Sequence, residues 1–430
     1  MRKRSIALLV AVVISMTGCN STKKSQVVNN EPSEVATVIP TEVSTTEPTE
    51  VMNTVTPEVE QIGYPKIEIS GVHKDYKSED GKRTTLYFGR QSATLVDGAR
   101  EEFPDLAKGL DTYFEDNKSA MERLADEWSK DAEQVIRENA FAEDREFSYS
   151  LNQEVNQLRN DRKILSLMLK VDSYLGGPHG NSSLSGATFD VETGKELLFS
   201  DIIWDMDGFK MVAEDFIVYT VEHYIPDMQD VEGYGFYPEY KETIADKMDH
   251  LDFVLTDYGM RVFFQEYEIA SYAAGVIAVD IPYSYIRDFM KEAYVIDETS
   301  PKLFEIGMYQ EYCLDFGDKG ANYRVYVTRN DENNVISNVT LKSEEQELVV
   351  YQSDHQEGYV DGKYFFMRNI NGKAYLLATF ELSDGSKETF VYKVENGKFV
   401  QTDEVQVGLL DDTKSIYDLW RVGNNEEKVW

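Results

Sequence analysis

The chain has 430 residues and is strongly acidic, with 78 aspartates and glutamates against 43 lysines and arginines, for a formal charge of −35. A field of this sign repels nucleic acid and anionic lipid headgroups, so we expect neither as a partner, and it favours basic proteins or cationic ligands. The same acidity suits a protein that only has to stay in solution.

Residues 1–19 have the pattern of a bacterial lipoprotein signal peptide. Three basic residues at positions 2–4 precede an uncharged apolar run over 6–14, and Gly18 leads directly into Cys19. The run is too short to span a bilayer, which indicates an export signal rather than an anchor. We therefore expect cleavage before Cys19 and lipidation of its thiol, which attaches the protein to the outer face of the cell membrane, exposed to the cell wall and the exterior. The alternative is an ordinary signal peptide with a chance cysteine.

Cys313 is the second of the two cysteines. Once Cys19 is lipidated, no intrachain disulfide is possible. A chain of this length buries a core large enough to fold without one. Because Cys313 lies in the strand-like run EYCLDF, we expect a buried, unreactive thiol.

Residues 20–62 predict a disordered tether. This stretch repeats Thr, Pro, Glu and Val without an aromatic residue and without a helical or alternating period. Such a composition buries too little apolar surface to offset the entropy of ordering. Its prolines and like charges extend the chain to as much as about 3.1 Å per residue, so the folded part would lie at a distance from the membrane. A plain spacer without a recognition role accounts for this composition.

Residues 63–160 predict an α+β unit. Segments rich in β-forming residues or with alternating polarity, which predict strands, are 64–70, 84–88 and 147–155. Between the second and third of these strands, residues 103–142 carry apolar side chains at spacings of three and four, with Glu and Asp on the other face. This pattern predicts one long amphipathic helix.

Residues 161–298 predict a second α+β unit, because strands and helices mix there without strict βαβ repetition. The expected strands are 164–173, 253–255, 261–264 and 276–281. The expected helices are 207–224, 240–249 and a closing helix over 284–293.

Two segments of this unit combine aromatic residues with glycine. The first, YLGGPHG over residues 174–180, is a sharp loop because its glycines permit backbone angles that other residues avoid. A hairpin turn at Thr193-Gly194 follows. The second segment, QEYEIASYAAG over residues 265–275, comes after the turn TDYG at 256–259.

These segments resemble the DUF3298 family, whose members carry a Y-x-G-G-A-H-G loop, an F-D-x-x-T-G-K turn, an L-T-x-x-G strand and a Y-E-I-A-P-Y-A-x-G loop in this order. The chain departs from that pattern at Pro178 and Ser271. Residues 63–160 resemble the DUF4163 domain, which precedes DUF3298 in a peptidoglycan deacetylase and in a lysozyme-sensing anti-sigma factor. The deacetylase T-F-D-D-G-P run and paired-histidine metal motif do not occur in the sequence, so the resemblance implies the accessory extracellular region.

The residues alone assign no catalytic set, metal site or cofactor. None of the histidines has the spacing of a metal pair; they are His73, His179, His223, His250 and His355. No G-x-S-x-G motif occurs, and the carboxylates are too numerous for one pair to stand out. His179 in its glycine loop is the best single candidate for chemistry, although a loop histidine more often bonds only to neighbouring backbone.

Residues 299–430 predict a separate all-β meander, as a sandwich or a partial propeller. Short strands alternate with hairpin signals at Asn371-Gly372, Asp384-Gly385 and Asn396-Gly397. We expect its aromatic residues, including Tyr359, Tyr375 and Trp420, to pack in the core or at edges rather than to form a carbohydrate platform.

The function that fits best is a surface-tethered binding or sensing module, with peptidoglycan or a basic extracellular protein such as lysozyme as its partner, by analogy with the resembling proteins. A cell-wall-modifying enzyme with a site near His179 and a structural envelope component are the alternatives. The binding face is expected from aromatic and acidic residues of the two loops, namely Tyr174, His179, Glu266, Tyr267, Glu268 and Tyr272. If it lies elsewhere, the aromatic loop 234–240 or the β-domain would supply it.

The lipoprotein prediction is tested with the two cysteines as a matched pair. Replacing Cys19 removes the acceptor of the lipid, so Cys19→Ser is expected to release the protein into the medium or leave it uncleaved, as seen by fractionation and immunoblotting. Cys313→Ser is the control and is expected to stay anchored. A Cys19→Ser protein that remains fully processed and membrane-bound would contradict the prediction.

Overall fold

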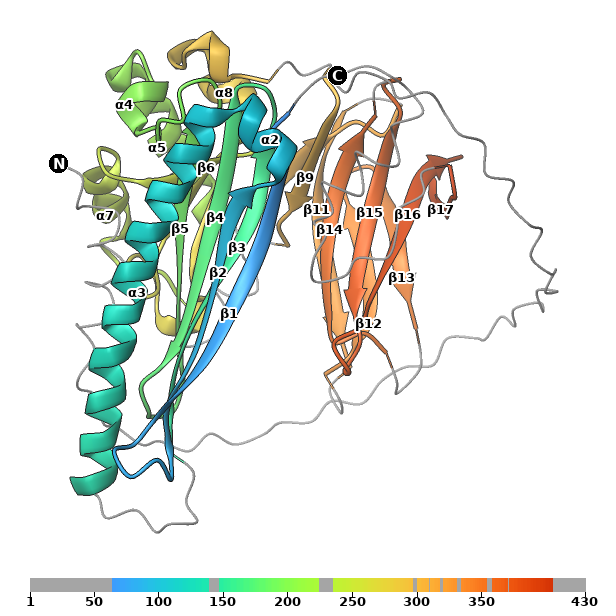
Figure 1. Cartoon of the computed structure of the whole chain (residues 1–430). Helices are drawn as coiled ribbons and strands as arrows, with labels where there is room; N and C mark the ends of the chain where they lie inside the picture. The colour runs from blue at the N-terminus through green and yellow to red at the C-terminus, as the bar shows by residue number, and fades with distance from the viewer. Residues whose placement is uncertain are drawn as a thin grey trace, which may run out of the picture.

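The computed structural model describes residues 64–138, 147–223, 235–296, 300–308, 310–317, 320–330, 334–353, 358–369 and 371–404. The predicted signal peptide, Cys19, the predicted tether and Trp420 lie outside these ranges. The described residues form four sheets with helices on the N-terminal side (Figure 1), and none of these sheets closes into a barrel. The expected sequence of a mixed α+β part followed by an all-β part is roughly consistent with this arrangement. No described helix has the length and apolar character needed to cross a membrane.

The first sheet has the order β1-β2-β3-β4-β5. Its strands are β1 (Ile67–Lys77), β2 (Thr84–Leu95), β3 (Tyr149–Asn160), β4 (Ile164–Tyr174) and β5 (Asn181–Asp190). All neighbours are antiparallel except β2 and β3, which run parallel. A parallel pair needs a long crossover, and helix α3 provides it. The four predicted strands of this sheet are confirmed and are mostly longer than the patterns indicated.

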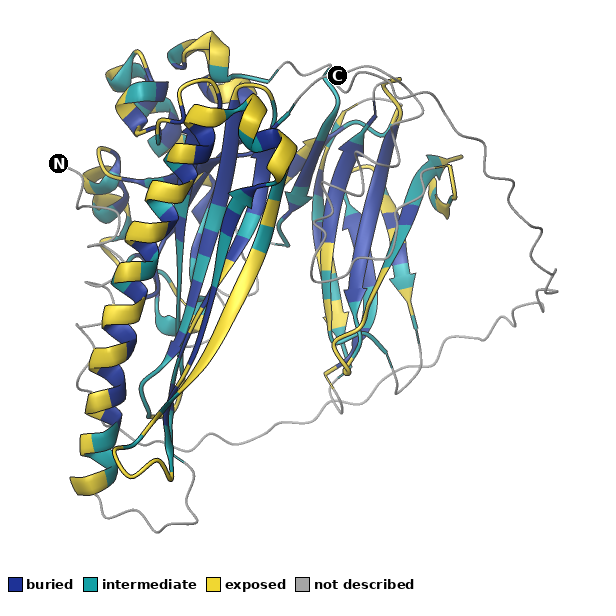
Figure 2. Cartoon of the chain, viewed as in Figure 1, coloured by how far each residue is buried: buried dark blue, intermediate teal, exposed yellow. Residues whose placement is uncertain are grey.

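Helices α2 (Asp97–Glu102) and α3 (Pro104–Glu138) pack on one face of this sheet. The predicted helix over 103–142 is confirmed as α3, which starts one residue later at Pro104, a position where proline's missing N–H costs nothing. Residues 139–142 lie outside the described ranges, and α2 was not predicted. The buried stripe of α3 faces the sheet and its charged face is exposed (Figure 2). A buried Asn117–Gln153 pair, joined by two hydrogen bonds of 2.9 and 3.0 Å, separates two apolar clusters under the helix.

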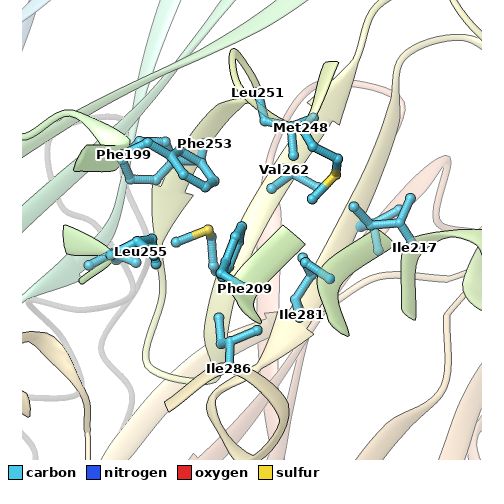
Figure 3. Packing of buried hydrophobic residues seen from close by; sticks show 14 of the residues in the cluster. Phe199, Phe209, Ile217, Met248, Leu251, Phe253, Leu255, Val262, Ile281 and Ile286 are labelled. Carbon is cyan, nitrogen blue, oxygen red and sulfur yellow. The ribbon is translucent and has the colours of Figure 1, made fainter. Parts of the chain in front are cut away.

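A second layer contains α4 (Phe199–Ile202), α5 (Met206–His223), α7 (Tyr240–Lys247) and a three-stranded sheet of β6 (Asp252–Leu255), β7 (Gly259–Phe264) and β8 (Ile277–Pro282). Helix α5 buries Phe209, Ala213 and Ile217 against this sheet in the largest apolar cluster (Figure 3). The predicted strands and the first two predicted helices of this region are confirmed within a few residues.

The predicted closing helix over 284–293 is wrong. The chain instead forms one turn of helix, α8 (Tyr283–Ile286), and two short 3₁₀ turns, η2 (Arg287–Phe289) and η3 (Glu292–Tyr294). The backbone N–H of Trp204 donates to the carbonyl of Phe289, and the N–H of Lys291 donates to the carbonyl of Ile202. These bonds to the α4 segment take the place of a continuing helical ladder.

Residue 186 lets β5 and β6 approach closely. A Cβ atom on Gly186 would lie 1.8 Å from the carbonyl oxygen of Phe253, a distance that no side chain permits. The hydroxyl of Ser166 on β4 also accepts a 3.0 Å hydrogen bond from the N–H of Leu255. The three-stranded sheet is thereby held directly over the β4 and β5 side of the first sheet, where Val254 and Phe263 pack with Leu158.

The C-terminal strands form two sheets, ordered β10-β11-β12-β13 and β17-β16-β15-β14-β9. Their bounds are β9 (Lys302–Ile306), β10 (Tyr312–Leu314), β11 (Ala321–Arg329), β12 (Ile336–Lys342), β13 (Glu347–Gln352), β14 (Asp361–Arg368), β15 (Ala374–Glu381), β16 (Lys387–Glu395) and β17 (Lys398–Gln401). Residues from both sheets share one apolar cluster. Gly372, Gly385 and Gly397 have positive φ, which confirms the three predicted hairpin turns.

One strand of this part was not predicted, one expectation is wrong and one is confirmed. The unpredicted strand is β9, whose sequence KLFEI is short. Cys313 is exposed rather than buried, because on β10 it alternates with Tyr312 and Leu314, which both face the core. Tyr375 is buried and Tyr359 stacks on Phe380 at 4.6 Å, so both pack as expected.

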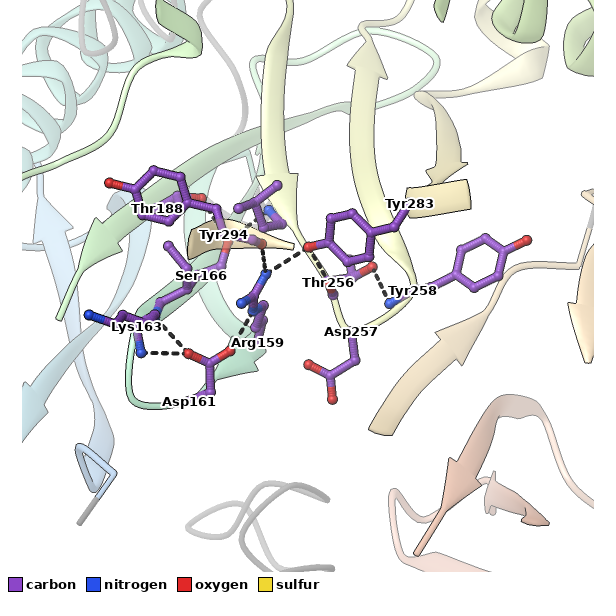
Figure 4. A network of polar contacts seen from close by, with 12 residues as sticks. Arg159, Asp161, Lys163, Ser166, Thr188, Thr256, Asp257, Tyr258, Tyr283 and Tyr294 are labelled. Carbon is purple, nitrogen blue, oxygen red and sulfur yellow. Dashed lines mark hydrogen bonds and ion pairs between the residues drawn. The ribbon is translucent and has the colours of Figure 1, made fainter. Parts of the chain in front are cut away.

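Two buried arginines join the layers. Arg159, at the end of β3, donates to Asp161 at 2.7 Å, to the Tyr283 hydroxyl at 2.7 Å and to the carbonyl of Tyr294 at 2.6 Å, linking the first sheet to α8 and η3 (Figure 4). Burial lowers the pKa of a guanidinium, but the neighbouring tyrosine hydroxyl and carboxylate outweigh it and raise the pKa of Arg159, so it stays charged.

The second arginine, Arg261 on β7, pairs with Asp280 on β8 through bonds of 2.7 and 2.8 Å. Asp280 also accepts from the hydroxyl of Tyr312 on β10. The backbone of Asp280 exchanges two bonds, of 2.8 and 2.6 Å, with the side chain of Gln310. This one aspartate therefore connects the three-stranded sheet to the C-terminal strands.

Asp280→Asn tests the importance of this connection. The substitution keeps the shape but removes the carboxylate that bonds the buried Arg261 guanidinium, and leaves only Glu305, 3.9 Å away, as a counter-charge. We therefore expect the free energy of unfolding to fall by about 3 kcal/mol. Glu347→Gln, in the exposed Lys342–Glu347 pair, is the control and is expected to change it by less than about 1 kcal/mol. Urea unfolding followed by circular dichroism measures both, and equal effects would contradict the assignment.

Candidate functional site

The loop after β4 turns back sharply into β5. Gly176 and Gly177 have φ of 81° and 98°, in the region that side chains avoid. The hydroxyl of Tyr174 donates a 2.9 Å hydrogen bond to the carbonyl of Gly177, and the Nδ1 atom of His179 lies 3.0 Å from the carbonyl of Gly180. The glycines and these bonds together present the exposed His179 ring from a defined position.

The loop between β7 and β8 carries the second group of predicted residues. Tyr267 has φ of 65°, an unfavourable value for a residue with a bulky side chain, and its ring is 37 % exposed. Ala270 forms a bridge with Phe236, and a short 3₁₀ turn, η1 (Tyr272–Ala274), ends at Gly275. The backbone therefore directs the Tyr267 ring outward instead of letting it join the core.

The structure brings the two loops together through their aromatic rings. The hydroxyl of Tyr272 donates a 2.8 Å hydrogen bond to the carbonyl of Gly180. The rings of His179 and Tyr272 stack with centroids 3.8 Å apart and an interplanar angle of 24°, and the Tyr267 ring lies 5.7 Å from that of Tyr272. We call His179, Tyr267 and Tyr272 the aromatic platform.

The predicted acidic residues have a different role from the one expected. Glu266 is 7 % exposed and accepts a 3.1 Å hydrogen bond from the N–H of Ser182. Glu268 forms an ion pair with Lys247 and accepts a 2.8 Å bond from the N–H of Gln265. Both carboxylates are therefore engaged inside the fold instead of facing a partner.

Together with two neighbours, Glu266 covers the free edge of β5. The side-chain oxygen of Gln265 accepts from the N–H of Leu184 at 3.1 Å, while its amide donates to the Leu184 carbonyl at 2.7 Å. Asp252 accepts from the N–H of Gly186 at 3.4 Å. Alternate N–H groups of the strand are thus satisfied by side chains where a further strand would otherwise pair.

Residue Gln265 was missed by the sequence reasoning, as was the edge role of its neighbours. The available signal was a run of polar residues placed directly after the fully buried strand β7, a position where polar side chains must find partners. The pattern could not show that those partners lie on β5.

Burial perturbs two of these carboxyls. Desolvation raises the pKa of Glu266, and the hydrogen bond from the N–H of Ser182, followed by the nearby His179, opposes this in part. Desolvation also raises the pKa of Asp252 to about 6, against the lowering effects of its bond to Gly186 and of Lys247.

The platform presents aromatic rings with polar edges at the surface. In the described part of the chain, no group of three or more His, Cys, Asp or Glu side chains could hold a metal ion. The platform offers two tyrosine rings and an imidazole with polar edges, which are amphipathic surfaces typical of binding sites. The enzymatic alternative would use His179, whose Nδ1 atom lies 3.0 Å from the carbonyl of Gly180.

The raised pKa of Asp252 predicts a pH dependence of stability. Its folded-state pKa of about 6 exceeds the usual aspartate value of 3.8, so the folded state binds this proton more tightly than the unfolded state. The free energy of unfolding therefore falls by about 2 to 3 kcal/mol as the pH rises from about 4 to about 6. Asp252→Asn is expected to remove that fall, as measured by urea unfolding across this range.

The control for Asp252→Asn is Asp116→Asn on the exposed face of α3. This substitution removes the same charge without a buried partner and is expected to leave the fall in place. A pH profile of Asp252→Asn that matches the unmodified protein would show that Asp252 does not titrate in this range.

The comparisons with known proteins bear on this region. The family model described as "Protein of unknown function (DUF3298)" matches residues 210–284, which include the loop 265–275 but not the loop 174–180. A DUF3298 crystal structure from Bacteroides fragilis aligns with 54 % of this chain and 96 % of its own, at 18 % identity and a TM-score of 0.40. One from Pseudomonas aeruginosa aligns with 54 % and 98 %, at 15 % identity and a TM-score of 0.35. No curated protein matches. Residues 210–284 of this chain form a DUF3298 domain.

Proposed function

We propose that this protein is a lipid-anchored module on the outer face of a bacterial membrane, and that its aromatic platform binds a cell-wall glycan. The observation that carries the proposal is the set of three rings held at the surface by two loops, with His179 and Tyr272 stacked at 3.8 Å. The predicted lipid at Cys19 and the predicted tether place such a module beside the cell wall.

The geometry suits a sugar because a pyranose ring presents an apolar face edged with hydroxyls. The ring of Tyr267 provides an apolar surface for that face, while tyrosine hydroxyls and the imidazole supply polar contacts at its edge. The platform is already ordered by the Tyr272–Gly180 bond and by the glycine turns. Binding therefore costs little additional side-chain ordering.

A basic protein is less well matched to this site. The expected attraction relied on Glu266 and Glu268, but one is buried against Ser182 and the other is neutralised by Lys247. What remains exposed is aromatic, without an acidic carboxylate among the predicted site residues. The platform is thus a better surface for stacking than for attracting cations.

The resemblance of residues 63–160 to DUF4163 supports the same proposal by analogy only. In the resembling deacetylase and anti-sigma factor, these domains lie outside the cell membrane. A glycan-modifying enzyme using His179 and a purely structural envelope component are the alternatives, and the binding experiment below separates them.

Tyr267→Ala and Tyr272→Ala test the platform. Each removes a ring, so we expect binding of purified peptidoglycan in a sedimentation assay, and of a soluble glycan fragment in calorimetry, to weaken by about tenfold or more. Tyr87→Ala and Tyr326→Ala remove rings that are 47 % and 41 % exposed elsewhere, and are expected to bind normally.

The outcomes separate the three hypotheses. Equal binding by all four variants would remove the platform from consideration, and no binding by the unmodified protein would favour a structural component. Release of soluble product from labelled peptidoglycan, lost in His179→Ala, would identify an enzyme instead.

A further inference from the structure

The outer face of α5 carries large apolar side chains that are not part of the core. Met211 is 64 % exposed and Tyr219 55 %, and their separation of eight positions corresponds to about 12 Å along the helix. Trp204, 62 % exposed, precedes the helix by two residues, and Tyr285 on α8 is 54 % exposed. The Tyr285 ring contacts Phe216 of α5 with centroids 4.8 Å apart. We call Trp204, Met211, Tyr219 and Tyr285 the α5 ridge.

The side chains of the α5 ridge do not contribute to the main apolar cluster. The opposite face of α5 already fills the main apolar cluster with Phe209, Ala213 and Ile217. The other exposed apolar side chains on strands are spread over three sheets, namely Val72, Tyr87, Tyr326, Val349 and Val400. Single exposed apolar residues are normal on protein surfaces, whereas a grouped set of Trp, Met and Tyr is typical of interaction sites.

Acidic residues alternate with the apolar ones along this face. Asp207 follows Trp204 by three residues and precedes Met211 by four, and Asp215 lies four residues from both Met211 and Tyr219. Within α5, these spacings place Asp207, Met211, Asp215 and Tyr219 on one stripe of the helix, whereas Trp204 lies just before its first turn. Among the described residues, Asp207, Glu214 and Asp215 form no ion pair, whereas Glu222 at the end of the helix is paired with Lys241.

We propose that the α5 ridge binds a basic amphipathic helix of a partner protein. The apolar residues of that helix would pack on Met211, Tyr219 and Trp204 at spacings of three and four, and its lysines or arginines would lie over Asp207 and Asp215. Apolar and acidic side chains alternate along the α5 ridge. A partner helix with apolar and basic side chains in the same order would place its basic groups on the acidic ones and its apolar groups on the apolar ones.

Charge excludes two other occupants. A second copy of this chain would bring a net charge of −35 to an acidic surface, and an anionic membrane surface would be repelled for the same reason. The partner is therefore cationic on the side that meets the ridge. This inference does not depend on glycan binding at the aromatic platform, whose residues are different.

The probe is a labelled peptide of about 14 leucines and lysines, with leucines at helical spacings so that it forms an amphipathic helix about 21 Å long. Two peptides control for charge alone: one with the same residues in an order that breaks the apolar face, and one with glutamate in place of lysine. Binding to the full chain is measured by fluorescence anisotropy at low and high salt. We expect the amphipathic lysine peptide to bind best, and more weakly as salt rises.

Matched variants locate the binding on the ridge. Met211→Ser with Tyr219→Ser is expected to weaken binding by about tenfold or more, while Tyr87→Ser with Tyr326→Ser changes it by less than about twofold. Asp207→Asn with Asp215→Asn is expected to weaken binding and reduce its salt dependence. Glu122→Gln with Asp126→Asn on α3 removes the same charge and is expected to have little effect.

Two results would overturn the proposal. One is equal binding by the ridge variants and their controls, with all variants shown to be folded by circular dichroism. The other is equally tight binding of the peptide with the broken apolar face, which would reduce the interaction to attraction between net charges. Neither result affects the platform, so failure here is distinguishable from failure of glycan binding.

Discussion

The edge of β5 is the constraint on which the rest of the N-terminal structure depends. A strand that ends a sheet leaves a row of unpaired N–H groups. Here the N–H groups of Ser182, Leu184 and Gly186 are satisfied by side chains from β6 and from the loop after β7. Because Gly186 lets the β6 backbone come close, the three-stranded sheet packs over the β4 and β5 side of the first sheet. The loops after β4 and after β7 meet for this reason, and the platform is the result.

Sequence patterns predicted most strands and helices, because apolar periodicity and glycine turns are local signals. The prediction of a closing helix over 284–293 was wrong because the backbone of this segment forms hydrogen bonds with the α4 segment. Apolar periodicity carries no information about such long-range bonds. The prediction that Cys313 is buried was wrong because the pairing of β10 with β11 decides which residues of β10 face the core. The two aromatic loops of the site were predicted, and the structure places them together. The roles of Glu266 and Glu268 could not be predicted, since an acidic residue looks the same whether it faces solvent or a buried N–H.

The high negative charge is therefore used in two ways. Some carboxylates are structural: Asp280 joins the three-stranded sheet to the C-terminal strands through Arg261 and Tyr312, and Glu266 completes a strand edge. Others remain at the surface, such as Asp207 and Asp215 on α5. Net charge alone does not locate a binding surface, because only the second kind is available to attract a cation.

Tyr267 shows what this arrangement means for engineering. A bulky residue with φ of 65° is strained by about 1 to 2 kcal/mol relative to glycine, and strain of this kind concentrates at functional sites. A search for stabilised versions of the protein would favour glycine or asparagine at residue 267, because either relaxes the backbone. Each would also remove a ring from the platform, so selection for thermal stability and selection for ligand binding would act in opposite directions at this residue.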